Sequence, residues 1–181
     1  MIPPLFRTPD PTIAALYGAI VAQARDPRFY QAYAVPDTVL VRFDLIVLHM
    51  ALVLRRFRED SAKRPLAQGV FDAFCRDMDH NLREMGISDP GVPRQMQKVG
   101  EAFYGRAQAY DAALAERGDD ALVQALVRNV YAGASGRESA AARLAAYVRQ
   151  GVETLDAQPL EELARGGVRF PEPVTLMPAA E

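Results

Sequence analysis

Residues 38–60 read TVLVRFDLIVLHMALVLRRFRED, and this stretch decides the fold. Its apolar residues fall on every side of the helix that it would form, instead of along one stripe. A helix that is apolar all round lies inside a fold, surrounded by other elements. Its most apolar part, residues 45–54, is too short to span a bilayer, which needs about 20 apolar residues. We therefore expect residues 38–60 to form a central buried helix.

The rest of the chain divides at turn residues into helix-length pieces with apolar residues at helical spacing. The pieces begin near residues 10, 27, 65, 92, 119, 137 and 159. Several end at a glycine, such as Gly86, Gly118 and Gly133, a typical residue after the last turn of a helix. Strand patterns extend over only a few residues. The sequence predicts an all-α fold: one globular domain of about seven to eight helices around the central apolar helix at about 38–60.

The 181 residues are enough for one domain with a sizeable core. We expect residues 1–167 to form this helical domain. Residues 168–181 contain three prolines, which predicts an extended or disordered C-terminal tail. The first residues have neither the basic and apolar pattern of a secretion signal nor that of an organelle presequence. This indicates a cytoplasmic protein.

Composition narrows the function classes. The formal net charge is −2, which argues against a nucleic-acid partner because phosphate binding needs clustered positive charge. Cys75 is the only cysteine, and a small buried helix residue is the simpler interpretation of it. His49 and His80 are the only histidines, and neither belongs to a Glu-x-x-His pair. The sequence also lacks a Gly-x-Ser-x-Gly motif and a phosphate-binding loop. We predict neither catalysis nor a metal or cofactor.

Three polar residues interrupt the central helix and are candidates for a buried polar group: Arg42, Asp44 and His49. Buried charges need partners and can mark functional sites. The simpler interpretation is that Arg42 and Asp44 lie near solvent or pair with a neighbouring helix. His49 is then a hydrogen-bonded core histidine.

The segment from Phe71 to Tyr110 carries the most unusual features. Gly100 and Gly105 lie inside a predicted helix, where each costs about 1 kcal/mol relative to alanine. Such glycines indicate the close approach of another backbone or an inserted side chain. Gly105 belongs to the run FYGR, residues 103–106, and Tyr110 follows one turn later. Aromatic residues and arginine are favoured at interfaces, although an apolar helix contact explains the stripe equally well.

Four runs together carry a resemblance to a known family. They are RFDL (42–45), FDAF (71–74), DMDHNLREMG (77–86) and GEAFYGR (100–106), the last followed by Tyr110. Over roughly residues 10–150 the chain resembles the ubiquinol–cytochrome c chaperone family, and it is similar to the bacterial members. Each run alone is a weak signal, whereas the third and fourth in this order are specific.

The resemblance implies an assembly chaperone of the cytochrome bc1 complex (respiratory complex III). Mitochondrial members bind newly made cytochrome b and hold it until haem and further subunits are added. They act with a small partner protein and near the ribosome exit region. The resemblance implies no enzyme activity and no cofactor, and it places the chain in the cytoplasm or peripherally at the cytoplasmic face of the inner membrane.

The candidate partner-binding residues combine positions that match the family with apolar residues suited to a greasy client. They are Phe74, Asp77, Met78, Asp79, Leu82, Arg83, Glu84, Met85, Met96, Phe103, Tyr104, Arg106 and Tyr110. The alternative is a small-ligand or cofactor-binding protein or enzyme. Its pocket would lie between the central helix and the helix pair at 66–116, lined by Arg42, Asp44, His49 and His80.

Overall fold

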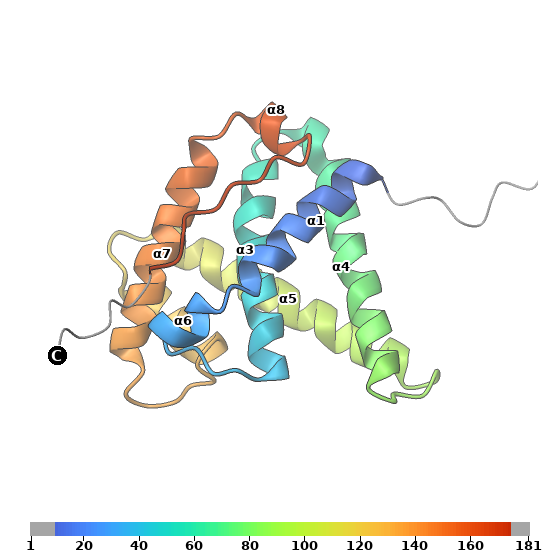
Figure 1. Cartoon of the computed structure of the whole chain (residues 1–181), viewed down its shortest axis with the longest axis horizontal. Helices are drawn as coiled ribbons and strands as arrows, with labels where there is room; N and C mark the ends of the chain where they lie inside the picture. Colours follow the sequence, from blue (N-terminus) through green and yellow to red (C-terminus); the bar gives the residue numbers. More distant parts are fainter. Residues whose placement is uncertain (1–9, 175–181) are drawn as a thin grey trace, which may run out of the picture.

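Helices in three layers make up the computed structural model, which describes residues 10–174 (Figure 1). They are α1 (Pro11–Ala24), α2 (Arg28–Ala32), α3 (Val39–Phe57), the 3-10 turn η1 (Ser61–Lys63), α4 (Arg64–Glu84), α5 (Val92–Ala115), α6 (Asp120–Asn129), α7 (Glu138–Asp156) and α8 (Leu160–Leu163). No strand occurs in this described range. The prediction of an all-α fold is confirmed.

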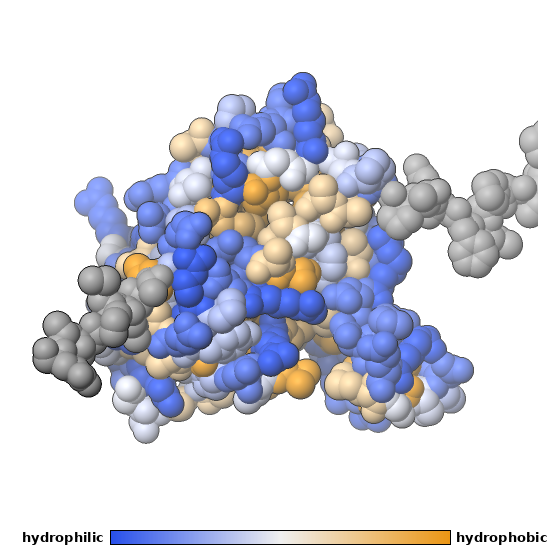
Figure 2. All heavy atoms as spheres, in the orientation of Figure 1, coloured by the Kyte–Doolittle hydropathy of each residue, from blue (hydrophilic) through white to orange (hydrophobic). Residues whose placement is uncertain are grey.

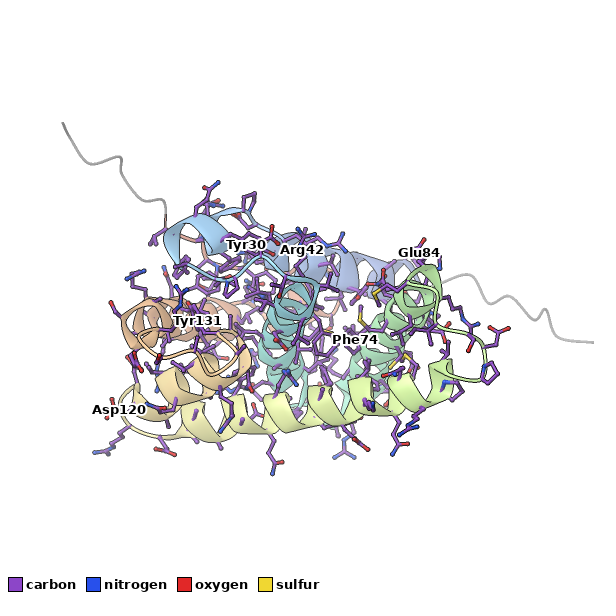
Figure 3. The ribbon with its side chains drawn as sticks, turned by 90° about the horizontal axis from the view of Figure 1, so that it is seen from below. Tyr30, Arg42, Phe74, Glu84, Asp120 and Tyr131 are labelled. Carbon is purple, nitrogen blue, oxygen red and sulfur yellow. The ribbon has the colours of Figure 1, made fainter. Side chains whose placement is uncertain are left out.

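The middle of the molecule is α3. Every residue from Asp44 to Val53 is buried, and α3 contacts α1, α4, α5 and α7. Figure 1 shows α1 in front of α3 and α5 behind it, and Figure 3 shows the same layers from below. The Thr38 hydroxyl starts α3 by accepting a hydrogen bond from the Val41 N–H (3.2 Å). The prediction of a central apolar helix is confirmed.

Close helix packing occurs at a glycine other than the two expected. A Cβ atom on Gly69 would collide with the Ile13 side chain, so this glycine lets α4 pack on α1. At Gly100 and Gly105, by contrast, no atom lies within 4 Å of the place where a Cβ would be. The prediction of a close approach at these two positions is wrong. Open space lies beside α5 instead.

Residues 168–174 run extended along the molecule, packed on the helices (red in Figure 1). The Gln158 side chain holds the segment at Arg169, donating to its carbonyl oxygen (2.7 Å) and accepting from its N–H (3.2 Å). Farther along, Pro171 and Pro173 are buried. The expected tail therefore packs on the domain up to residue 174, while residues 1–9 and 175–181 lie outside the described range.

The most apolar of the long helices is α3, which makes it the first candidate for a membrane span. Across residues 10–174, no helix combines the length and the continuous apolarity needed to cross a bilayer.

Candidate functional site

The helices α4 and α5 form a long hairpin whose outer half extends beyond the core. In α4 the fully buried residues, Val70 and Phe74, lie in the first half of the helix. Figure 3 shows Glu84 at the outer end of α4 and Phe74 between α4 and α3. On the face in Figure 2, the hairpin end forms a projecting lobe at the lower right, largely covered by hydrophilic side chains. Many of the predicted partner-binding residues lie on this lobe.

The structure sorts the predicted partner-binding residues by exposure. Arg83, Glu84, Met85 and Tyr104 are exposed, and Met85 and Tyr104 are 58% and 61% exposed. The half-buried residues are Asp77, Met78, Asp79, Leu82, Met96 and Arg106. Phe74, Phe103 and Tyr110 are buried in the core. As a correction, Phe74 and Tyr110 are part of the packing beneath the surface, whereas Phe103, 3% exposed, contributes to the lining of a surface groove.

Polar contacts on the hairpin are mostly local. The Tyr17 hydroxyl on α1 donates a hydrogen bond to Asp77 (2.7 Å), which ties the base of the lobe to the body. Arg83 pairs with Asp79 (2.7 Å) and with Asp89 across the turn. Exposed pairs of this kind contribute little to stability. They leave Arg83 and Asp79 available on the surface.

A buried ion pair joins α3 to α5. The Asp44 carboxylate, 1% exposed, lies 2.6 Å from Nε of Arg106, which is 20% exposed. The Arg106 guanidinium also lies over the ring of Phe43, 5.6 Å from its centroid. Burial raises the pKa of Asp44 to about 6, against the opposing effect of Arg106. Asp44 thus pairs with a neighbouring helix, and Arg106 holds two helices together.

The other two residues predicted to be buried polar groups, Arg42 and His49, differ in exposure. Arg42 is exposed and pairs with Asp37 (2.8 Å), so its assignment as a buried group is wrong. It lies in the first turn of α3, before the helix enters the core (Figure 3). His49 is fully buried.

His49 belongs to a chain of hydrogen bonds in the core. Its Nδ1 lies 2.7 Å from the Leu45 carbonyl oxygen, which only accepts, so Nδ1 carries the proton. Its Nε2 therefore accepts from the Tyr147 hydroxyl (2.9 Å), and Gln23 donates to that hydroxyl oxygen (2.9 Å). Burial lowers the pKa of His49 to about 4. Because every polar atom of the ring has a partner, His49 is a structural core residue.

This lowered pKa predicts a dependence of stability on pH. An unfolded histidine takes up a proton below its ordinary pKa of about 6.5, whereas the folded chain does so only near pH 4. The contribution of His49 is thus complete above about pH 6.5 and is lost as pH falls. We expect wild type to lose about 2 kcal/mol more than a His49→Gln variant between about pH 7 and pH 5. Asp44 and His80 are present in both proteins, so urea unfolding at the two pH values isolates His49; equal losses would contradict the assignment.

A groove opens at the surface between the end of α3, the start of α4 and the middle of α5. Its volume is about 360 Å³, and a shallower hollow adjoins it along α5. The groove is lined by Ala51, Leu54, Arg55, Arg58, Arg64, Ala67, Gln68, Phe71, Phe103, Tyr104, Ala107 and Asp111. It is therefore in the place that the alternative prediction gave to a ligand pocket. None of Arg42, Asp44, His49 and His80 lines it, so the predicted lining is wrong.

Charged residues reach the groove from the end of α3, the start of α4 and α5. Arg58 pairs with Asp111 across it (2.7 Å), and Arg55 approaches Asp156 outside it (3.3 Å). Arg64 is exposed and forms no ion pair within residues 10–174. The rings of Phe71 on α4 and Tyr104 on α5 lie with their centroids 5.5 Å apart and add aromatic surface to the groove.

The three arginines of the groove, Arg55, Arg58 and Arg64, were not among the residues predicted from the sequence. Arg55 and Arg58 follow the apolar run directly, and Arg64 comes six residues after Arg58. An arginine cluster at the end of a buried helix was thus a visible signal. The arginine cluster becomes part of a groove only because α5 crosses nearby and brings Tyr104 and Asp111 beside it.

Metal-ligating side chains are scattered over the molecule. Among the residues that the structure describes, no three of the histidine, cysteine and acidic side chains lie close enough together to hold a metal ion. His80 pairs with Glu84 on the exposed face of the hairpin (3.1 Å).

Comparisons with known proteins identify relatives. The family model described as Ubiquinol-cytochrome C chaperone matches residues 31–170. Among solved structures, the chain is similar to the Cbp3 homolog from Brucella abortus, with 41% sequence identity, a TM-score of 0.82 and 91% of each chain covered. No curated protein matches the chain. The matched range includes both the α4–α5 hairpin and the groove.

Proposed function

Because the chain belongs to the ubiquinol–cytochrome c chaperone family, we propose that it assists assembly of the cytochrome bc1 complex by binding newly made cytochrome b. It holds this client until haem and further subunits are added. The observation that carries the proposal is the open groove between α3, α4 and α5, which presents apolar and aromatic side chains at the surface. A groove of this kind suits an apolar client segment.

The residues around the groove support a binding surface better than a catalytic site. Tyr104 is 61% exposed on its rim, and open space beside Gly100 and Gly105 leaves α5 accessible. The alternative, a small-ligand or cofactor-binding protein or enzyme, requires convergent polar groups in the pocket. Its four predicted polar residues lie elsewhere, and Arg58 and Arg64, which do line the groove, are exposed to solvent. We therefore infer a chaperone without catalysis of its own.

The client also suggests where the protein acts. Cytochrome b is a membrane protein, so we expect binding at the cytoplasmic face of the inner membrane, with at most peripheral association. A small partner protein or the ribosome exit region are further partners that the family suggests. We expect no nucleic-acid partner, because the net charge of the chain is −2.

Deletion of the gene tests the function. We expect assembled cytochrome bc1 complex to fall severalfold, while the other respiratory complexes stay at their normal amounts. Blue native gels and haem b absorbance measure this fall, and wild-type protein restores the complex. Normal bc1 levels in the deletion strain would refute the proposal.

Photo-crosslinking in cells tests the surface. A photoreactive phenylalanine in place of exposed Tyr104 is expected to capture cytochrome b. The same group in place of exposed Arg143 on α7, outside the groove, is the matched control. Capture from position 143 but not from position 104 would place the client elsewhere on the protein.

A further inference from the structure

The charge of the groove differs from that of the whole chain. Three of its lining residues are arginines, Arg55, Arg58 and Arg64, and one, Asp111, is acidic. The whole chain carries a formal net charge of −2. Charges of opposite sign attract each other, and each exposed pair contributes about 0–1 kcal/mol. The groove therefore favours an acidic occupant.

Two of the arginines are accessible to a partner. The Arg58 side chain is 59% exposed and pairs with Asp111, and Arg64 has no acidic partner in the described chain. Exposed pairs contribute only about 0–1 kcal/mol, so exchanging Asp111 for a carboxylate of the partner costs little. Asp111 thus competes with the occupant for Arg58.

The shape of the groove favours a peptide helix over an acyl chain. An acyl chain is best covered by an enclosed tunnel, whereas this groove is open along α5. Gly100, Tyr104 and Asp111 lie at helical spacing on one face of α5, and the space beside Gly100 is empty. A helix lying along this face would place apolar residues on Phe71 and Tyr104 and acidic residues beside Arg58 and Arg64.

We propose that the groove recognises an acidic amphipathic helical segment of the client, whose carboxylates pair with Arg58 and Arg64. This inference rests on the proposed function and adds the chemical class of the bound segment. The recognised segment is then an amphipathic helix of cytochrome b that lies at the membrane surface. It is not the uncharged middle of a membrane-spanning helix.

Purified full-length protein and two synthetic peptides test the inference. Each peptide is an amphipathic helix of about 18 residues with leucines on one face, long enough to hold a helix. One carries glutamates on the other face, and the second carries lysines. Fluorescence anisotropy at physiological salt is expected to show about tenfold tighter binding of the glutamate peptide.

Charge variants make the test specific. Arg58→Glu combined with Arg64→Glu is expected to reverse the preference, and Asp111→Asn is expected to tighten binding of the glutamate peptide. Two exposed arginines elsewhere, in Arg143→Glu combined with Arg165→Glu, give a control with the same change in net charge. Circular dichroism melting verifies that every variant is folded. Equal affinities for the two peptides, no binding of either, or equal effects of the groove and control variants would overturn the inference.

A lipid headgroup is the competing source of negative charge. Binding of the wild type to phosphatidylglycerol vesicles, abolished by the groove variant while neither peptide binds, would assign the site to lipid and overturn the inference. Failure of the acidic-segment inference can be distinguished from failure of the proposed chaperone function. If position 104 still captures cytochrome b in the Arg58→Glu, Arg64→Glu background at wild-type yield, the chaperone function stands and only the acidic-segment inference is wrong.

Discussion

Replacing Arg106 by glutamate is expected to lower the free energy of unfolding by about 3–5 kcal/mol. Asp44 is buried, and Arg106 is the cation that lies 2.6 Å from it. The variant removes this cation and adds a second carboxyl group at the same place. Two carboxyl groups cannot both be ionised at this buried place. The folded variant must therefore bind a proton at one of them, or the α3–α5 contact must open. Urea unfolding followed by circular dichroism measures the loss.

Two further variants isolate the cause. Arg42→Glu makes the same change on α3, where the arginine is 58% exposed and pairs only with Asp37, and we expect a loss of about 0–1 kcal/mol. Replacing Asp44 and Arg106 together by leucine removes both charges, and it is expected to recover most of the loss, because apolar residues often substitute well for a buried pair. An Arg106→Glu variant as stable as Arg42→Glu would refute the structural role.

This prediction changes how Arg106 is used as a probe of function. From the sequence, Arg106 and Tyr104 were both predicted to bind the partner. The structure gives the two neighbours different roles, because Tyr104 faces the groove and Arg106 faces Asp44. Loss of client capture in an Arg106 variant would therefore not distinguish a damaged interface from a destabilised fold. Tyr104, Arg58 and Arg64 avoid this ambiguity.

The helices were predictable because local chemistry sets where each one begins and ends. Thr38 supplies the N-terminal cap of α3, and Gly86 and Gly118 adopt positive φ angles just after α4 and α5. The central position of α3 follows from its composition alone, since a helix apolar on every side needs neighbours on every side.

The site was less predictable because it depends on how helices cross. The charge of Asp44 signals that a partner is needed, but α3 alone does not select Arg106 from many arginines. The groove likewise needs Arg58 of the segment after α3 and Tyr104 of α5 to meet. A glycine inside a helix does not by itself predict close packing. Gly69 packs closely on α1, whereas open space lies beside Gly100 and Gly105.

The C-terminal segment gives the second large effect: Phe170→Ala is expected to cost about 2–3 kcal/mol of unfolding free energy. Phe170 packs on the buried core and meets the His49 ring edge-on, with centroids 5.2 Å apart. Truncating a fully buried phenylalanine costs about 3–5 kcal/mol, and Phe170 is only half-buried. Its neighbour Glu172 is exposed and pairs with Arg28 at the surface, so Glu172→Ala is the matched control, with an expected loss below about 1 kcal/mol.

The pKa of His49 gives an independent measurement on the same variant. Phe170 covers one side of a ring whose pKa burial holds near 4. Removing the phenyl group admits water, and water stabilises the charged imidazolium, so we expect this pKa to rise toward about 6.5. The chain has two histidines, and only His49 is buried, so nuclear magnetic resonance titration separates it from exposed His80. If Phe170→Ala leaves both the stability and the pKa of His49 unchanged, residues 168–174 do not cover the core in solution; changes in both would establish the segment as part of the folded domain.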